Sequence, residues 1–301
     1  MAVFAGQGDA RRSMRLLWRD RAPGAAAAGS GAAGSGPAGS GPAGSGPAGS
    51  GPAGSGSAES GAAGSGRRPG LSVDAVVDAA IALADEDGMA AVSMRAVGQR
   101  LGRTAMALYT YVADKAELVD LMCDKVLGEL PVDYPLDSGW RSALTAWARD
   151  NREFYLRHPW VLQVSQARPV LGPNEFTTVE TLVRVLRATG LEASVLRGVL
   201  GALVQFVRGA AAVIADARSA ARVTGMGDDE WWYSRSSLLE EVSPDFADRF
   251  PLSTWFGQEP PPPVPGNECA PYLERDAVRN FEVGLAVLLD GIEATVARGG
   301  A

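Results

Sequence analysis

The side chains with the clearest chemistry lie close together between positions 95 and 115, where cationic and hydroxyl-bearing residues alternate with small ones. They are Arg95, Arg100, Arg103, Thr104, Tyr109, Thr110, Tyr111 and Lys115. Such groups donate hydrogen bonds to phosphate oxygens and to base edges, which is the chemistry of nucleic-acid recognition. The spacing includes no nucleophile beside a base and no metal-ligand cluster. It therefore predicts binding and not catalysis.

Two short helices joined by a tight turn would position these side chains. Ser93 suits the start of the first helix, because its hydroxyl can accept a bond from a free backbone N–H. Met94, Val97 and Leu101 recur at spacings of three and four, which gives this helix one apolar side. Gly102 then supplies a left-handed residue that ends the helix at low steric cost. The pattern is typical of a helix-turn-helix.

The second helix of this motif is expected to begin at Thr104 and to point Leu108 into the core. Its outward residues are Ala105, Met106, Ala107 and Thr110. A helix-turn-helix places the N-terminus of its second helix in the major groove of DNA. Two alternatives remain at single positions: Met106 could pack inward, and Tyr109 could be a core aromatic residue whose hydroxyl reaches the surface. The motif as a whole predicts DNA binding.

Charge is distributed unevenly along the chain. The 301 residues carry a net charge of −7 at pH 7, which argues against a general polyanion-coating protein. Residues 1–70 hold seven arginines and three acidic residues, whereas residues 71–130 hold five basic and ten acidic residues. Attraction to phosphates must therefore be local, and nonspecific affinity for DNA should be modest.

The composition also disfavours several classes of protein. One histidine and two distant cysteines, Cys123 and Cys269, predict neither a disulfide scaffold nor a metal site. The longest apolar run, 199–215, is interrupted by Gln205 and Arg208, so we expect no membrane span. We expect a soluble, cytoplasmic protein without a cofactor.

The first seventy residues are expected to be a disordered tail. Residues 24–66 are almost entirely Gly, Ser, Ala and Pro, with the pentapeptide GSGPA repeated, and cannot bury apolar surface. A dinucleotide-binding spacing at 29–34 follows from this repetition and has no strand before it. The segment MRLLWRDRAP, from Met14, is an alternative start, a short docking element or, as we favour, part of the unstructured tail.

The rest of the chain predicts an all-α fold with two domains. Residues 71–130 form the first, where apolar positions from Val73 to Ala84 predict an amphipathic helix closed by Gly88. Asp114 and Glu117 resemble a capping box that opens the helix after the motif. Prolines at 131 and 135 mark the boundary, and residues 136–298 form a second, helical domain.

Helical periodicity in the second domain predicts four longer helices. They run from near Trp140 to His158, over 175–188, over 192–216 and over 272–296. The stretch between the last two holds Trp231, Trp232 and the run PPPPVP at 260–265, which is either a docking ligand or, more simply, part of a stiff loop.

At this point the chain resembles the TetR family of bacterial repressors. The likeness is strongest over 71–128, on the segment DGMAAVSMRAVGQRLGRTAMALYTYVADKAEL, and extends through 138–297. The segments RHPWVLQVSQARP and FEVGLAVLLDGIE are similar to the C-terminal domain of the tetracycline-repressor subgroup. The resemblance implies a homodimer with two DNA-binding domains on a helical core that binds a small molecule.

The resemblance also implies roles for individual residues. Thr104, Tyr109 and Lys115 fall on positions that grip phosphates, and Tyr111 offers a further hydroxyl donor. Positions that meet base edges are occupied by Arg103, Ala105, Met106, Ala107 and Thr110. Alanines touch at most thymine methyl groups, so Arg103 is the better candidate for direct readout. Lys115 would lie at a helix N-terminus, which also favours anions.

One departure from the subgroup concerns its metal ligand. Tetracycline repressors carry a histidine shortly before an Arg-Pro pair, whereas here Arg168-Pro169 follows Val164-Ser165-Gln166. His158 lies too early for that role and is expected to end a helix by bonding a carbonyl. The sequence therefore argues against a magnesium–tetracycline inducer.

The predicted ligand site is a mostly apolar pocket with a few amide contacts. Its candidate residues are Trp147, Phe154, Gln163, Gln166, Asn174, Gln205, Phe206 and Trp231. Aromatic residues at helical spacing are alternatively core. The helices near 192–216 and 272–297 are the expected dimer interface, since Gly198, Gly201 and Gly209 suit close approach of a neighbour.

We therefore predict a DNA-binding repressor released from a palindromic operator by a small apolar or amphipathic molecule. Its two recognition helices would be about 34–36 Å apart on DNA, and a ligand that prefers another spacing would weaken binding. A ligand-free repressor and an all-helical enzyme are the alternatives.

Overall fold

The computed structural model describes residues 3–4, 6, 8–19, 71–258 and 270–299. The predicted all-α architecture is confirmed, because the regular elements in these ranges are helices apart from two short strands. A small domain holds α2 (Val73–Asp87), α3 (Met94–Leu101), α4 (Ala105–Leu108) and α5 (Lys115–Leu127). Its local signals act as predicted, since the Ser93 hydroxyl accepts from Ala96 N at 3.1 Å and Gly102 has φ +64°.

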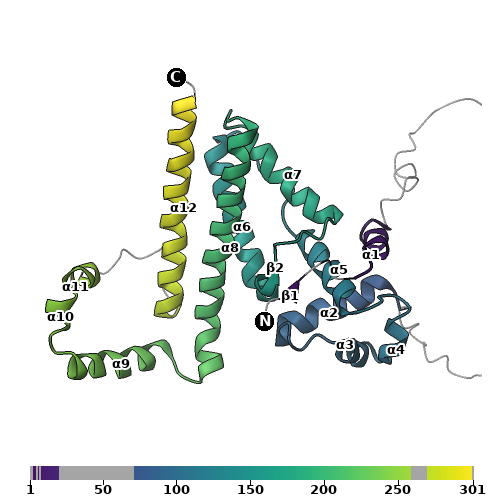
Figure 1. The fold of residues 1–301 in the computed structure, drawn as a ribbon, viewed down its shortest axis with the longest axis horizontal. Helices are drawn as coiled ribbons and strands as arrows, with labels where there is room; N and C mark the ends of the chain where they lie inside the picture. The colour runs from purple at the N-terminus through teal and green to yellow at the C-terminus, as the bar shows by residue number, and fades with distance from the viewer. Residues whose placement is uncertain (1–2, 5, 7, 20–70, 259–269, 300–301) are drawn as a thin grey trace, which may run out of the picture.

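The larger domain is a bundle around a long central helix. Its members are α6 (Gly139–Arg157), α7 (Pro173–Arg187), α8 (Ala193–Thr224) and α12 (Tyr272–Gly299). Helix α8 packs against both α6 and α12, while α7 slants toward the small domain and contacts α5 (Figure 1). Between α6 and α7 the chain forms a 3-10 helix (Pro159–Gln163) and the strand β2 (Val164–Ser165).

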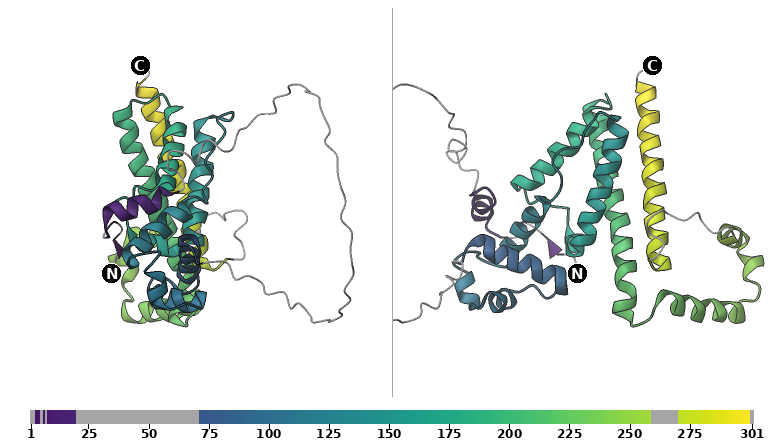
Figure 2. Two further views of the ribbon diagram at one scale, coloured as in Figure 1. Left: turned by 90° about the vertical axis from the view of Figure 1, so that its right-hand side faces the viewer. Right: turned by 180° about the vertical axis from the view of Figure 1, so that it is seen from behind.

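An arm of three helices connects α8 to α12. It consists of α9 (Asp228–Val242), α10 (Phe246–Arg249) and α11 (Pro251–Gln258), and it projects from one end of α8 away from the bundle (Figures 1 and 2). No described side chain of these three helices is buried. The sequence indicated only a variable stretch here, because none of the three has a core-facing stripe. The proline run at 260–265 lies outside the described residues.

The N-terminal segment differs from its prediction. The strand β1 (Val3–Phe4) pairs in parallel with β2, and α1 (Ala10–Leu17) packs against α5. The expectation of an unstructured tail is therefore wrong for these residues, and the docking alternative for the segment at Met14 is right. Leu17 is buried against its neighbours, a contact that the segment's own composition could not reveal. Residues 20–70 lie outside the described ranges.

By length and composition α8 is apolar enough to cross a membrane, as the core helix of a soluble protein also can be. Only 22% of the relevant window is buried within this single chain. The expectation based on Gln205 and Arg208 therefore did not capture how apolar this helix is. Most of the apolar window of α8 is thus left uncovered by the single chain.

Candidate nucleic-acid interface and ligand cavity

Helix α4 is held rigidly on α3 by close backbone contact. Leu108 is 0% exposed, and Arg103 N donates to Gly98 O at 2.8 Å. A Cβ at Gly98 would lie 2.9 Å from Arg103 O and 3.3 Å from Ala105 N, so only glycine fits there without displacing the turn. The orientation of α4 is thus determined by packing on its inner side.

The outer side of α4 carries most of the residues predicted to face DNA. Met106 is 75% exposed and Tyr109 43% exposed, which excludes both inward alternatives. Residues Arg103, Thr104 and Thr110 are also exposed. The Thr104 hydroxyl accepts from Ala107 N at 3.4 Å, the predicted cap.

Three of the predicted contact residues are less open than expected. Ala105, Ala107 and Tyr111 are half-buried and not fully exposed, and Ala105 and Tyr111 pack against the core. The short α4 turns its start toward α3, which explains why Ala105 is partly covered. These residues present only part of their surface to a ligand.

The start of α5 resembles the predicted capping box, except that the return bond from Glu117 reaches the residue before the N-cap. Asp114 Oδ1 accepts from Glu117 N at 2.8 Å, and Glu117 Oε2 accepts in return from Ala113 N at 2.6 Å. Lys115, in the first turn, is exposed and forms no ion pair within the described ranges. It therefore presents an unneutralised positive charge beside a helix N-terminus.

The other cations near the motif differ in how free they are. Lys125 Nζ lies 2.6 Å from Asp78 and 3.5 Å from Asp74. Arg100 forms two hydrogen bonds with Glu86, at 2.6 and 2.5 Å, and this pairing lowers the pKa of the Glu86 carboxyl. Arg103 has no such partner among the described residues, so with Lys115 it is the natural phosphate or base contact.

Polar side chains connect the small domain to the bundle around His158. Its Nδ1 lies 2.8 Å from Asp85 and its Nε2 lies 3.1 Å from Glu129, while Trp160 Nε1 donates to Asp85 at 2.8 Å. His158 ends α6 as expected, but its ring bonds two carboxylates and not a carbonyl. Burial acts to raise the pKa of Glu129, but hydrogen bonds from His158 and Arg157 bring it below its ordinary value.

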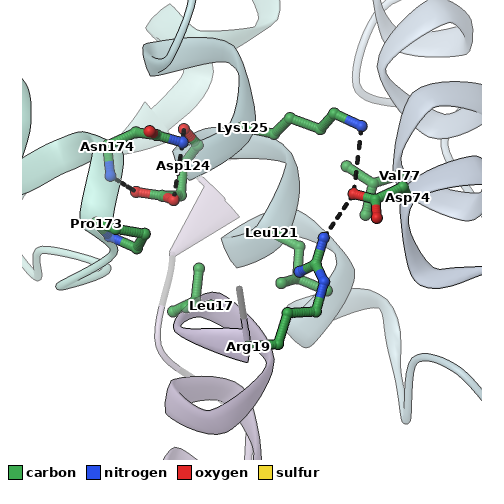
Figure 3. A pocket seen from close by; sticks show the side chains of 9 residues that line it. All are labelled: Leu17, Arg19, Asp74, Val77, Leu121, Asp124, Lys125, Pro173 and Asn174. Carbon is green, nitrogen blue, oxygen red and sulfur yellow. Dashed lines mark hydrogen bonds and ion pairs between the residues drawn. The ribbon is translucent and has the colours of Figure 1, made fainter. Parts of the chain in front are cut away.

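A second link joins α5 to α7. Asp124 Oδ1 accepts from the backbone N–H groups of Asn174 and Glu175, each at 3.0 Å, in the first turn of α7. Asn174 Nδ2 also donates to Asp124 O at 3.0 Å (Figure 3). A Cβ at Gly172 would lie 2.1 Å from Asp124 Oδ1, so the carboxylate is seated directly on the backbone. One helix is therefore capped by a side chain of another.

A small cavity of about 60 Å³ lies where α5, α6, the 3-10 helix, β2, α7 and α8 meet. Its lining consists of Cys123, Leu127, Tyr155, Val161, Val164, Ser165, Gln166, Arg168, Val170, Glu175 and Arg208. Arg208 Nη2 donates to Leu162 O and Val164 O, both at 2.7 Å, while its buried Nη1 has no hydrogen-bond partner among the described residues. Burial raises the pKa of Glu175 and that of Cys123, the latter to about 12.

The structure does not bring the eight predicted pocket residues together. Only Gln166 lines this cavity; Trp147 and Phe154 are core, and Phe206 stacks on Phe281 with ring centroids 5.7 Å apart. Asn174 belongs to the cap on α7, Gln163 and Gln205 are exposed, and Trp231 lies on the arm. Sequence reasoning missed Arg208 as a lining residue, although an arginine inside an apolar helix was a usable signal.

Comparison with known proteins agrees with this architecture. Residues 76–122 match the model for bacterial regulatory proteins of the tetR family, and residues 134–296 match the tetracyclin repressor-like C-terminal domain. The chain is 37% identical over 235 residues to the HTH-type transcriptional repressor DrrR1 of Streptomyces coeruleorubidus, which covers 77% of this chain and 81% of that protein. It is 31% identical over 124 residues to the class D tetracycline repressor protein of Escherichia coli, covering 40% of this chain and 56% of the repressor.

Solved structures share this fold. Apo ActR from Streptomyces coelicolor superposes with a TM-score of 0.59 at 23% identity, covering 76% of this chain and 98% of ActR. ActR in complex with actinorhodin gives a TM-score of 0.59 at 25% identity, covering 75% of this chain and 97% of that one.

Proposed function

Because the chain belongs to the TetR family of ligand-responsive DNA-binding transcriptional regulators, we propose that it is a cytoplasmic, dimeric repressor released from a palindromic operator by a small molecule. The observation that carries this proposal is the exposed outer side of α4 beside Arg103 and Lys115, two exposed cations with no ion pair among the described residues. Arg103, Ala105, Met106, Ala107 and Thr110 would meet base edges. Thr104, Tyr109, Tyr111 and Lys115 would grip phosphates.

A homodimer through α8 and α12 explains the uncovered side of the bundle. A Cβ at Gly198, Gly201 or Gly209 would meet no atom within 4 Å, so these glycines are not required by packing within one chain. Val213 and Val287 are 58% and 64% exposed on the two helices. A second copy would bury these apolar faces in a four-helix interface, and the glycines would allow the backbones to approach closely.

The partner subunit would also cover the arm. Along α9–α11 several aromatic side chains are exposed, among them Trp232, Tyr233, Trp255 and Phe256. Exposed apolar patches of this kind are typical of interaction sites. The arm lies between α8 and α12, the two helices of the proposed interface (Figure 1), so a second copy bound to these helices would lie beside it.

The ligand would enter the cavity around Arg208. ActR has been crystallised with actinorhodin, which supports a small-molecule site in a chain of this fold. The Nη1 of Arg208, buried without a hydrogen-bond partner among the described residues, favours a ligand that offers an acceptor oxygen to a pocket of mixed apolar and polar lining. A volume of about 60 Å³ holds roughly two water molecules, so binding must separate the walls of the cavity. That separation would change the spacing of the two DNA-binding domains.

A mobility-shift and footprinting experiment tests the proposal. The wild-type dimer should protect a two-fold symmetric site upstream of its own coding region, and actinorhodin is a reasonable first probe for release. Retained binding with every compound tried would favour a ligand-free repressor. Failure to bind any DNA would overturn the regulatory proposal and reopen an enzymatic role.

A further inference from the structure

The described part of the N-terminal segment, here called the N-terminal strap (residues 3–4, 6 and 8–19), lies outside both family matches, yet it contacts both domains. One end pairs β1 with β2, Val3 opposite Val164 and Phe4 opposite Ser165. Val164 and Ser165 line the cavity, and Val164 O accepts from Arg208. This end of the strap is therefore bonded to the cavity wall.

The middle of the strap is bonded to α5 and to the turn before it. Gly6 N donates to Asp120 Oδ1 at 2.8 Å. Arg12 Nε lies 3.2 Å from both carboxylate oxygens of Glu117, and its Nη2 donates to Tyr111 O at 3.4 Å. Glu117 is 1% exposed and holds Ala113 N, so Arg12 completes a chain of bonds that fixes the turn between α4 and α5. Tyr109 and Lys115 flank that turn.

A third anchor lies at the end of α1. Trp18 Nε1 donates to Leu171 O at 3.1 Å, and Trp18 and Phe176 have ring centroids 6.2 Å apart. Leu171 has φ +61°, a left-handed conformation that L-residues rarely adopt. Arg19 bonds Asp74 at 2.5 Å across a pocket between α1, α2, α5 and α7 (Figure 3). Residue Arg19 thus connects the strap to α2 as well.

We propose that the N-terminal strap transmits movement of the cavity wall to the turn between α4 and α5, beside the predicted DNA contacts, with Arg12 as the residue that positions this turn. β2 forms part of the cavity wall and β1 is paired with it, so any displacement of β2 on widening of the cavity would be passed to β1. The strap is short and is fixed at three places, so displacement at one end changes the strain at the other. The consequence for DNA rests on the function proposed above; the mechanical connection does not.

Hydrogen exchange of the full-length protein tests the connection without DNA or ligand. Arg12→Ala should speed exchange of amides in 105–116 and also in 160–171, although Arg12 touches only the first of these segments. Arg15→Ala is the matched control, because Arg15 is an exposed arginine on the same helix with no hydrogen bond or ion pair among the described residues. Faster exchange in 105–116 alone, or equal effects of both variants, would overturn the proposal.

A second variant perturbs the strap at its other end, next to β1. Gly6 has φ +70° with open space around it, so Gly6→Ala strains the bend between β1 and α1 without a clash. It should raise exchange in 160–171 and in 105–116 together. Unchanged exchange in 105–116 would show that the two ends are independent.

A binding measurement then examines the effect on DNA. Duplexes selected from a random pool by the wild-type protein should bind Arg12→Ala about fivefold more weakly, with Arg15→Ala close to wild type. Equal losses in the two variants would mean that only charge is lost, which contradicts positioning. If the wild-type protein selects no duplex, the DNA function fails, while the exchange result still decides the connection.

Discussion

The two lysines of this chain allow the proposed phosphate contacts to be tested by comparing the DNA affinities of two matched variants. Both lie on α5, but Lys115 is exposed with no ion pair in the described ranges, whereas Lys125 is neutralised by Asp78 and Asp74. We expect Lys115→Ala to weaken DNA binding and Lys125→Ala to leave it unchanged. The difference follows from local pairing, because the two residues share a helix and a charge.

The expected magnitude follows from counterion release. Each phosphate contact contributes about 0.9 to the slope of log K against log salt, and the proposed homodimer would lose two contacts when Lys115 is replaced. The slope should therefore become shallower by about 1.8. Between roughly 50 and 200 mM salt, the wild-type protein should lose about tenfold more affinity than Lys115→Ala.

Fluorescence anisotropy with a labelled operator at several salt concentrations measures this slope directly. Tyr109→Phe is a second control, since it removes a hydroxyl without removing charge and should lower affinity at an unchanged slope. An unchanged slope in Lys115→Ala, or an equal change in Lys125→Ala, would refute the placement of Lys115 on a phosphate.

Three further results are expected. Gly98→Val should destabilise the small domain by about 1–3 kcal/mol in thermal melts, because its side chain would meet the backbone of the turn, whereas Gln99→Val on the exposed side of α3 should be mild. Burial raises the pKa of the Cys123 thiol to about 12, so iodoacetamide should label it only after denaturation; rapid labelling at Cys123 in native protein, separated from labelling at Cys269 by peptide mapping, would contradict the packing. Glu129 has a lowered pKa in the folded state, so its contribution to stability is present above its ordinary value of 4.5 and is lost as the pH falls through the lowered pKa. Glu129→Gln should flatten that acid limb of a denaturation profile, and an unaltered limb would exclude the contribution.

Local signals explain why the helix-turn-helix could be predicted in detail. Caps at Ser93 and Asp114 and the left-handed turn at Gly102 involve residues within a few positions of one another, so the sequence contains the whole interaction. The length of α8 was underestimated, because its last turns carry arginines and continue past the apolar stripe.

The cavity and the N-terminal segment could not be predicted in the same way. The cavity lining comes from six elements and the loop after β2, and aromatic side chains such as Phe154 became core once those elements packed. Helix α1, which ends at Leu17, packs against α5, and Trp18 gains Phe176 on α7 as a partner; these contacts join residues about a hundred or more positions apart. An eight-residue helix of this kind is marginal alone and is stabilised by tertiary contact.

The cap that Asp124 places on α7 has a practical consequence for hybrid regulators. Exchange of DNA-reading modules between relatives would naturally cut the chain near the prolines at 131 and 135. Such a cut transfers α5, and with it Asp124, without the backbone at Gly172 and Asn174 that the Asp124 carboxylate contacts. A graft that retains an aspartate here and a glycine opposite it should assemble, whereas one that pairs the buried carboxylate with a bulkier residue should misfold at the seam.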